Sequence, residues 1–230
     1  MEVARHLGHL KHGFHSGDLD ENDMSNADET HFMVNMDNGK TLGFSGDQSV
    51  RYADVTSAGE GMTMLARLSG GPFARIELPL MIFKSQNRSY PIRCVPDDVR
   101  GIAYRTGPKG WTDTTIMQEW LKETRVIKLL SRNRIRHLFI DNRSGHNLDE
   151  GIISAPERVM TTIKFFFPNA TDLVQPCDSF VIQKIKDAWR RRWDSYKLSL
   201  LQHNAWTEGG RLPNLERRFF CGFQQKLLQM

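Results

Sequence analysis

Residues 135–142 read IRHLFIDN, a short and mostly apolar run that ends in the polar pair Asp141 and Asn142. A continuous apolar run of this length is typical of a strand whose two faces are both covered, as in the parallel strands of α/β folds. Polar side chains at the carboxyl end of such a strand mark the place where α/β folds position their sites. This stretch therefore predicts an α/β fold with a candidate site at Asp141.

Upstream of this run, strand patterns alternate with turn residues. Large residues alternate up to the pair Asn38 and Gly39, which favours a hairpin because a type I′ turn needs positive φ at both central positions. The pattern predicts an antiparallel meander. One strand is predicted before that turn and one directly after it, and further strands at residues 62–68 and 76–83, while residues 84–110 are interpreted as a polar loop.

Downstream, a strand is predicted at residues 160–167 and a long helix from Asp178 to about Gln202. The apolar residues of this helix share one face, and Asp178 falls on that face as well. An acid at a helix start can simply cap the first turn and complement the helix dipole, so a structural role for Asp178 stays open. The apolar face consists of Val181, Ile182, Ile185, Trp189, Trp193, Tyr196 and Leu200.

Two tryptophans belong to the stretch GWTDTTIMQEWL, which opens a helix predicted over residues 112–130. Trp111 and Trp120 are expected to be core residues. The alternative is that they form surfaces on which nucleic-acid bases stack.

The composition is that of a folded protein: 230 residues, of which 39% are hydrophobic and 25% charged. The apolar runs are far shorter than the roughly 18 residues that span a bilayer, and no secretory pattern opens the sequence. The three cysteines fit neither a disulfide framework nor a zinc pattern. We therefore expect a protein without a membrane segment that acts inside the cell.

The formal net charge of +4 is modest, but the basic residues are unevenly placed. One cluster lies on the predicted long helix, off its apolar face. Such a patch could receive a polyanion such as nucleic acid, and a plain solvated helix face is the alternative. The candidate DNA-binding residues are Lys184, Lys186, Arg190, Arg191 and Arg192.

Three acids occupy places that the fold could bring together: Asp28 in the first strand, Asp141 and Asp178. Two carboxylates about 4 Å apart repel by about 4 kcal/mol at an effective dielectric constant near 20, so a cation must lie between them. Oxygen ligands suit Mg²⁺ or Mn²⁺. Two such ions stabilise the attacking and departing oxygens of a phosphodiester displacement.

Three blocks carry a resemblance to a known family. They are Asp28-Glu29-Thr30, the DNRSGH of residues 141–146 and the PNATDLVQPCD of residues 168–178. They resemble the DET, DNxxxH and PPNxTxxLQPxD blocks of DDE-superfamily transposases of the pogo/Tigger type, whose relatives include jerky-like and centromere protein B-like proteins. The resemblance spans about residues 24–195. It implies an RNase H-like fold, with a mixed sheet of a three-strand antiparallel meander plus parallel strands, flanked by helices.

The resemblance also implies a function. Asp28, Asp141 and Asp178 would hold two Mg²⁺ or Mn²⁺ ions for hydrolysis of a DNA phosphodiester and transfer of the DNA 3′ end to target DNA. Asn142 and His146 match the second block and are expected to shape the site. DNA is then the partner, the nucleus the location, and a homodimer a possible assembly.

The expected organisation is a helical connector at residues 1–23, the catalytic domain at residues 24–205 and a C-terminal tail at residues 206–230. Residues 1–23 resemble only the linker that follows the helix-turn-helix DNA-binding domains of full-length relatives. A truncated or host-retained copy is therefore expected. The alternative function is a catalytically silent, transposon-derived nucleic-acid-binding protein, and a third is an RNase H-like nuclease acting on RNA or hybrids.

Overall fold

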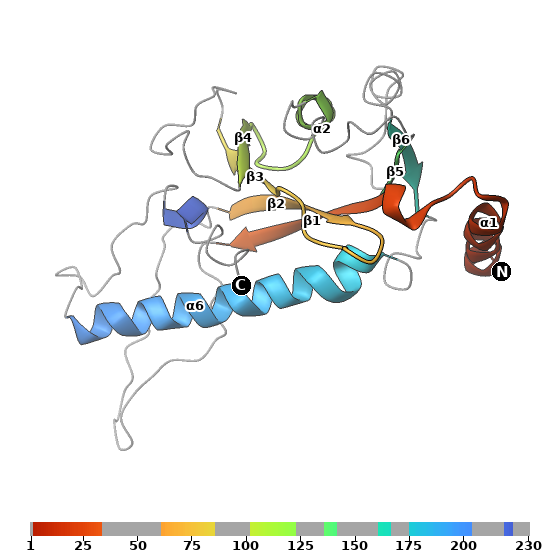
Figure 1. Ribbon diagram of the computed structural model, residues 1–230. Helices are drawn as coiled ribbons and strands as arrows, with labels where there is room; N and C mark the ends of the chain where they lie inside the picture. Colours follow the sequence, from red (N-terminus) through yellow and green to blue (C-terminus); the bar gives the residue numbers. More distant parts are fainter. Residues whose placement is uncertain are drawn as a thin grey trace.

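The computed structural model describes residues 2–33, 61–85, 102–122, 136–141, 161–166, 175–203 and 219–222. The described part of the chain forms a six-stranded sheet in the order β4-β3-β2-β1-β5-β6 (Figure 1). The strands are β1 (Met24–Met33), β2 (Gly61–Ser69), β3 (Leu80–Lys84), β4 (Ala103–Gly107), β5 (Arg136–Ile140) and β6 (Thr161–Phe165).

The sheet is mixed. β1, β2 and β3 pair antiparallel in sequence order, so the predicted meander is confirmed. β4 is parallel to β3, β5 to β1, and β6 to β5. Of the described strands, all except β2 therefore run in one direction, and their carboxyl ends lie at one edge of the sheet.

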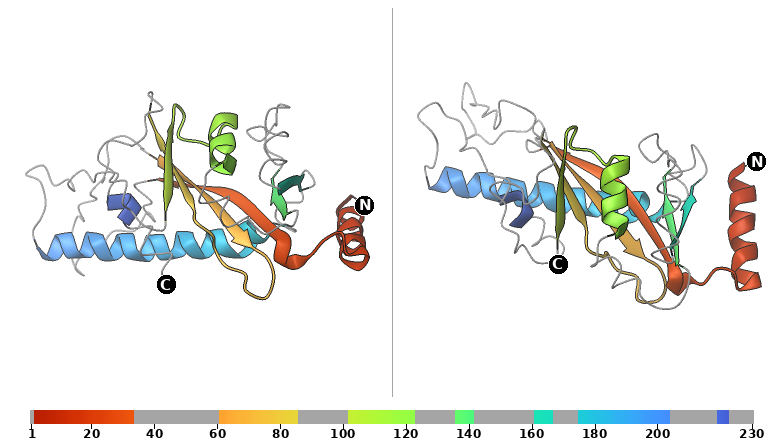
Figure 2. Two further views of the ribbon diagram at one scale, coloured as in Figure 1. Left: turned by 45° about the horizontal axis from the view of Figure 1, so that its top comes forward. Right: turned by 90° about the horizontal axis from the view of Figure 1, so that it is seen from above.

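Helices cover both faces of the sheet. The last helix begins with the π-helical turn η3 (Cys177–Ile182) and continues as α6 (Gln183–Gln202). Figure 1 shows α6 along one face and α2 (Thr114–Lys122) on the other. Figure 2 shows α1 (Glu2–Ser16) beside the β5 and β6 end of the sheet, before the short turn η1 (Glu21–Asp23) leads into β1. Within the described residues, no helix has the length and apolar character needed to cross a membrane.

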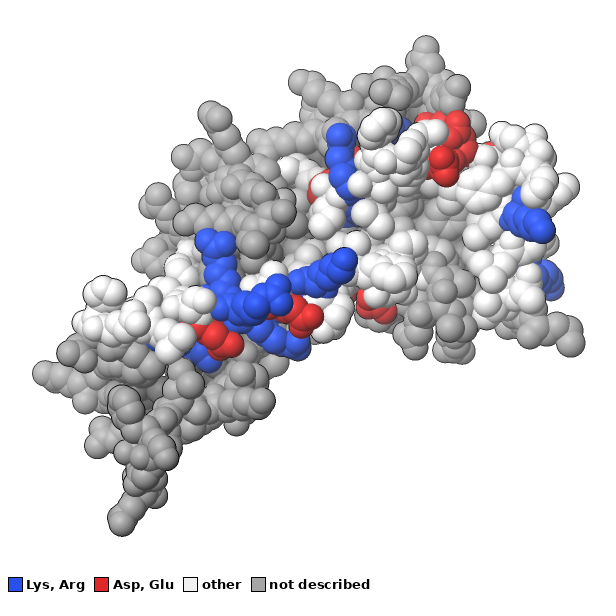
Figure 3. All heavy atoms as spheres, turned by 60° about the horizontal axis from the view of Figure 1, so that its bottom comes forward, with Lys and Arg blue, Asp and Glu red and all other residues white. Residues whose placement is uncertain are grey.

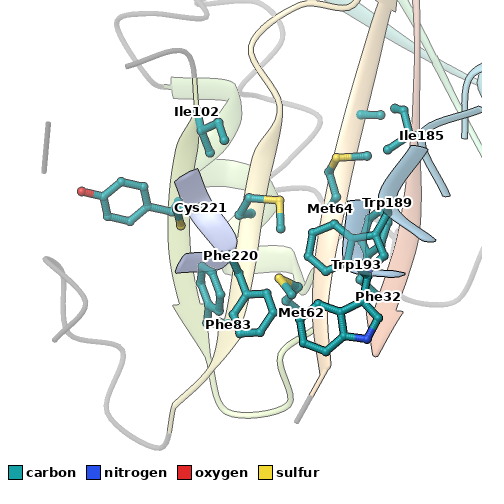
Figure 4. Packing of buried hydrophobic residues seen from close by; sticks show 13 residues of the cluster. Phe32, Met62, Met64, Phe83, Ile102, Ile185, Trp189, Trp193, Phe220 and Cys221 are labelled. Atoms are coloured by element: carbon teal, nitrogen blue, oxygen red, sulfur yellow. The ribbon is translucent and has the colours of Figure 1, made fainter. Parts of the chain in front are cut away.

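The core on the α6 side is built around two tryptophans. Trp189 and Trp193 are fully buried, and Figure 4 shows them pointing from α6 toward the methionines and Phe32 of the sheet. The rings of Phe32 and Trp189 are 5.0 Å apart. Large aromatic side chains contribute most of the area that such a core buries, so the predicted apolar face of this helix is confirmed. Val181, Ile185, Tyr196 and Leu200 also pack there.

The other face of the sheet packs against α2. Ala27, Leu65, Leu138 and Ile140 belong to this second core, and Trp120 joins it from α2 with 2% of its surface exposed. The predictions of a core role for Trp120 and of a strand covered on both faces at β5 are confirmed.

The expectation that Trp111 is a core residue is wrong, because half of its surface is exposed. It lies in the turn before α2, and its ring stacks on His31 of β1 rather than entering the core.

Two strand boundaries differ from the sequence pattern. β4 lies in the segment interpreted as a loop, because a strand of five residues between polar and Pro/Gly-rich stretches leaves no clear alternation. β3 begins at Leu80, and Ile76 forms only an isolated bridge with Leu68. Pro79 has no backbone N–H to donate, which explains why regular pairing starts after it. The hairpin predicted at Asn38 and Gly39 lies outside the described residues.

Candidate active site

Asp28 lies in β1, and Asp141 directly follows β5, the parallel neighbour of β1. The register of β1 and β5 pairs Asn26 with Phe139, which is 113 residues later in the chain. The same offset of 113 residues relates Asp28 to Asp141, which directly follows β5, whereas the paired positions themselves end at Asn26 and Phe139. Strand side chains alternate between the two faces of a sheet. Asp28 therefore points to the same face as Asn26, two residues before it. Both acids are buried, with 4% and 7% of their surface exposed.

The register also separates Asp28 from its neighbour Glu29. Asp28 is opposite Ala66, which packs in the core under α6, whereas Glu29 is opposite Leu65, which packs under α2. Directly opposed residues of antiparallel strands share a face, so the two acids point to opposite sides of the sheet. The backbone N–H of Glu29 donates to Oδ1 of Asp28 at 2.7 Å, which orients the Asp28 carboxylate.

Asp178 reaches this region because the start of the last helix is attached to β1. The backbone N–H of Cys177 donates to Oδ1 of Asn26 at 2.8 Å, and the Cys177 thiol lies 3.4 Å from the Asn26 carbonyl oxygen. Asn26 is two residues before Asp28 on the same face of β1, and Asp178 directly follows Cys177. The half-buried Asp178 thus stands on a π-helical turn, a feature often found at functional sites.

The pKa of the Cys177 thiol is affected by two of the candidate acids. Burial raises the pKa of its thiol to about 12, and the negative charges of Asp28 and Asp178 act in the same direction. Two of the three candidate acids therefore lie close enough to act on one sulfur. Cys177 itself is a neutral thiol at physiological pH, which disfavours it as a thiolate ligand.

The three aspartates do not form a complete metal site in the described part of the chain. In the parts of the chain that the structure describes, no group of three or more His, Cys, Asp or Glu side chains is arranged to hold a metal ion. Asn142 and His146, the two predicted site-shaping residues, lie outside the described residues. The described residues supply one buried carboxylate in β1, one directly after β5 and a third, half-buried, at the start of the last helix.

The predicted nucleic-acid-binding residues all lie on α6 but differ in exposure. Figure 3 shows Lys and Arg side chains gathered over this helix with a few acids among them. Arg190 is paired with Asp187 at 3.0 Å. Lys184, Arg190 and Arg191 are exposed, and Lys186 and Arg192 are half-buried.

Asn26 is the residue of this region that the sequence reasoning missed. It is buried, and its Nδ2 also donates to the Phe139 carbonyl oxygen at 3.1 Å. One amide therefore joins β1, β5 and the start of the last helix. The sequence does carry a signal for it. Asn26 is two residues before Asp28, and in a strand residues two positions apart point to the same face of the sheet.

Comparisons with known proteins show the family and the fold of the chain. Residues 74–216 match the family model described as DDE superfamily endonuclease, a region that contains Asp141 and Asp178 and begins after Asp28. No curated protein sequence matches the chain.

Two solved structures are similar to the chain. For a Mos1 transposase paired-end complex with left transposon end, the TM-score is 0.51 and the identity 11%, and the match covers 96% of this chain and 55% of that chain. For a pre-cleavage Mos1 transpososome the TM-score is 0.46 and the identity 12%, with 91% of this chain and 52% of that chain covered. The chain thus spans little more than half the length of either. The first likeness is one of fold, and the expected RNase H-like mixed sheet flanked by helices is confirmed.

Proposed function

The chain belongs to the DDE superfamily endonucleases, and from that premise we propose that it is the catalytic domain of a transposase of the pogo/Tigger type. Its reaction is hydrolysis of a DNA phosphodiester, followed by attack of the freed DNA 3′-hydroxyl on target DNA. Asp28, Asp141 and Asp178 are the proposed catalytic residues. Residues 24–205 form the proposed catalytic domain.

One observation carries the proposal most directly. The offset that pairs Asn26 with Phe139 also relates Asp28 to Asp141, and the bonds between Asn26 and Cys177 hold the helix that carries Asp178 against the same strand. These contacts support the proposal that three acids from distant parts of the chain act together beside β1. Buried carboxylates in such proximity repel by several kcal/mol unless a positive charge joins them.

The donor set fits a hard divalent cation. All three side chains offer carboxylate oxygens, the ligand type that Mg²⁺ and Mn²⁺ prefer, and the adjacent Cys177 thiol stays protonated. Asp28 and Asp141 would hold the ions from the sheet and Asp178 from the helix. When bound, two such ions activate water and stabilise the attacking and departing oxygens of the displacement. Asn142 and His146 are proposed to shape this site.

The remaining side chains of the site would orient the reaction. The Glu29 backbone N–H donates to Oδ1 of Asp28 and so orients its carboxylate. Burial of Asp28 and Asp141 limits access of bulk water, which strengthens every charge interaction in the site.

DNA is the proposed substrate, and the lysines and arginines of α6 are proposed to supply the phosphate contacts. Lys184, Lys186 and the arginines at 190, 191 and 192 stand on the helix that also presents Asp178, so a bound backbone passes near the acids. Binding through such contacts is independent of sequence and weakens steeply with salt. The proposed location is the nucleus, and the proposed assembly a homodimer.

The test is nicking of supercoiled DNA by the purified chain with Mg²⁺ or Mn²⁺. We expect metal-dependent nicking that is lost in Asp141→Asn and kept in Asp194→Asn, a matched change on the partly exposed side of α6. Salt-sensitive DNA retention without nicking under either metal would contradict the enzymatic proposal. That result would favour the silent nucleic-acid-binding alternative.

A further inference from the structure

The side-chain amide of Asn26 makes two long-range hydrogen bonds, and each of them ends beside a proposed catalytic acid. Its Oδ1 accepts from the backbone N–H of Cys177 at 2.8 Å, and its Nδ2 donates to the Phe139 carbonyl oxygen at 3.1 Å. Cys177 directly precedes Asp178, and Phe139 is two residues before Asp141. The two ends of one amide therefore act on two different acids.

The oxygen end of Asn26 serves as the cap of the last helix. Pro176 occupies the N-cap position, and its side chain makes no capping hydrogen bond. The first backbone N–H groups of a helix have no partner within the helix. Asn26 supplies the acceptor for the Cys177 N–H from β1, and the Cys177 thiol donates to the Asn26 carbonyl oxygen at 3.4 Å. Asp178, the next residue, thus takes its place from β1.

The nitrogen end holds β5 where its described pairing with β1 stops. That pairing ends at Asn26 and Phe139, and the Nδ2 bond links the same two residues through a side chain. On the other side of β5, the Ile140 carbonyl oxygen accepts from the Phe166 N–H at 3.0 Å. Asp141 directly follows β5. The amide therefore fixes, from the β1 side, the strand end that carries Asp141.

Asn26 acts through the acids and not at the reacting atoms, because backbone groups engage both ends of its amide. Its side chain is buried, with 6% of its surface exposed, so bulk water does not compete for either bond. Contacts that orient metal ligands in this way typically change metal affinity or activity by about ten- to a hundredfold. A merely structural bond would change stability alone.

We propose that Asn26 is a positioning residue of the proposed metal site. Its oxygen end sets the place of Asp178, and its nitrogen end sets the place of Asp141, both relative to Asp28 on the same strand. This inference rests on the proposed function, because it takes the three aspartates as joint ligands of divalent ions. It adds that two of the three ligands are placed separately by one side chain.

Two substitutions separate the ends of the amide. At about pH 8 the carboxylate of Asn26→Asp accepts from the Cys177 N–H but has no proton to donate to Phe139. Asn26→Leu is of similar size and offers neither group. Hydrogen exchange in EDTA reads out the anchors without any metal. Asn26→Asp should exchange faster than the wild type at residues 136–141 only, and Asn26→Leu at residues 136–141 and 177–182, while the body of α6 reports on global unfolding.

The functional readouts are Mn²⁺ affinity and the kinetics of DNA nicking. In folded Asn26→Leu, Mn²⁺ should bind at least about tenfold more weakly. The kcat of nicking should fall about a hundredfold, since displaced acids lose their joint geometry. The KM for DNA should not change, because the lysines and arginines of α6 are untouched. Asn26→Asp should recover about tenfold of the lost kcat, because it keeps the bond that places Asp178.

Ser25→Ala is the matched control. Ser25 precedes Asn26 on β1, is also 6% exposed and pairs with Leu138 of β5, but its side chain points to the opposite face of the sheet. It should leave exchange, Mn²⁺ affinity and kcat at their wild-type values.

Wild-type Mn²⁺ affinity and kcat in folded Asn26→Leu overturn the inference, as does unchanged exchange at residues 177–182 in that variant. If Asn26→Leu does not fold, Asn26→Asp decides alone, and wild-type exchange at residues 136–141 together with wild-type kcat overturns the inference. A wild type that neither binds Mn²⁺ nor nicks DNA overturns the proposed function instead, because the exchange measurement contains no metal and tests the anchors independently.

Discussion

Oδ1 of Asn26 accepts a hydrogen bond from the backbone N–H of Cys177 at 2.8 Å, across 151 residues of sequence. The other end of the same amide donates to the Phe139 carbonyl oxygen at 3.1 Å. One buried side chain therefore fixes the last helix and β5 to β1. The relative placement of the three aspartates depends on it.

Replacing Asn26 with alanine should destabilise the fold by about 2–4 kcal/mol, because it leaves a buried N–H and a buried carbonyl without their partner. Urea unfolding measures the loss. Asn22→Ala is the matched control, since the Asn22 side chain is exposed and bonds only locally to Asp20. Its effect should stay within about 0.5 kcal/mol. Equal stability of the two variants would show that the Asn26 bonds do not anchor the helix.

Replacing Trp189 with alanine should cost about 3–5 kcal/mol, because its fully buried ring packs on Phe32 and Phe220 and leaves a cavity. Leu198→Ala on the same helix removes a side chain that is 41% exposed and should cost far less. Thermal unfolding of both variants provides the comparison. Similar losses would contradict the assignment of this helix face to the core.

The stability of the protein should fall as the solution becomes alkaline. Burial raises the pKa of Cys177 and of Cys221 from 9.0 to about 12. The unfolded chain then releases these protons at lower pH than the folded chain. The stabilisation is complete below pH 9, and it is lost as the pH rises toward 12, by about 1.4 kcal/mol per pH unit for each thiol.

Urea unfolding from about pH 8 to about pH 11 tests this slope. Cys177→Ala and Cys221→Ala should each reduce it by the contribution of one thiol. Tyr196 also has a pKa raised by burial, but it is present in every variant and cancels in the comparison. Identical slopes in the wild type and both variants would mean that the thiols ionise as easily in the folded state.

The helices and strands whose apolar residues follow a clear pattern could be predicted from the sequence. The apolar run of β5 and the one-sided pattern of α6 each encode how they are covered, and both were confirmed. β4 could not be predicted, because a five-residue strand at one end of the described sheet depends on pairing with β3 alone. Register is likewise a property of two strands, so the pairing of Asn26 with Phe139 is visible only once β1 and β5 pair.

Side-chain partners beyond the local pattern were also out of reach. Trp111 lies in a stretch with helical spacing, which predicts burial, yet the turn at Gly110 places its ring on His31 instead. Asn26 was missed because its value lies in two contacts with distant backbone groups. The residue types were enough to single out the carboxylates, but the hydrogen bonds that hold their strands and helix together are visible only in the tertiary structure.

The central claim is that Asp28, Asp141 and Asp178 bind divalent ions at one place, and local backbone cleavage tests it most directly. Fe²⁺ takes the place of Mg²⁺, and ascorbate with peroxide then generates hydroxyl radicals that cut the chain close to the ion. The account predicts metal-dependent fragments ending near residues 28, 141 and 178 together, competed by excess Mg²⁺ and all lost in Asp141→Asn. Cleavage near one of these positions alone, or the same three cuts in Asp141→Asn, would contradict it.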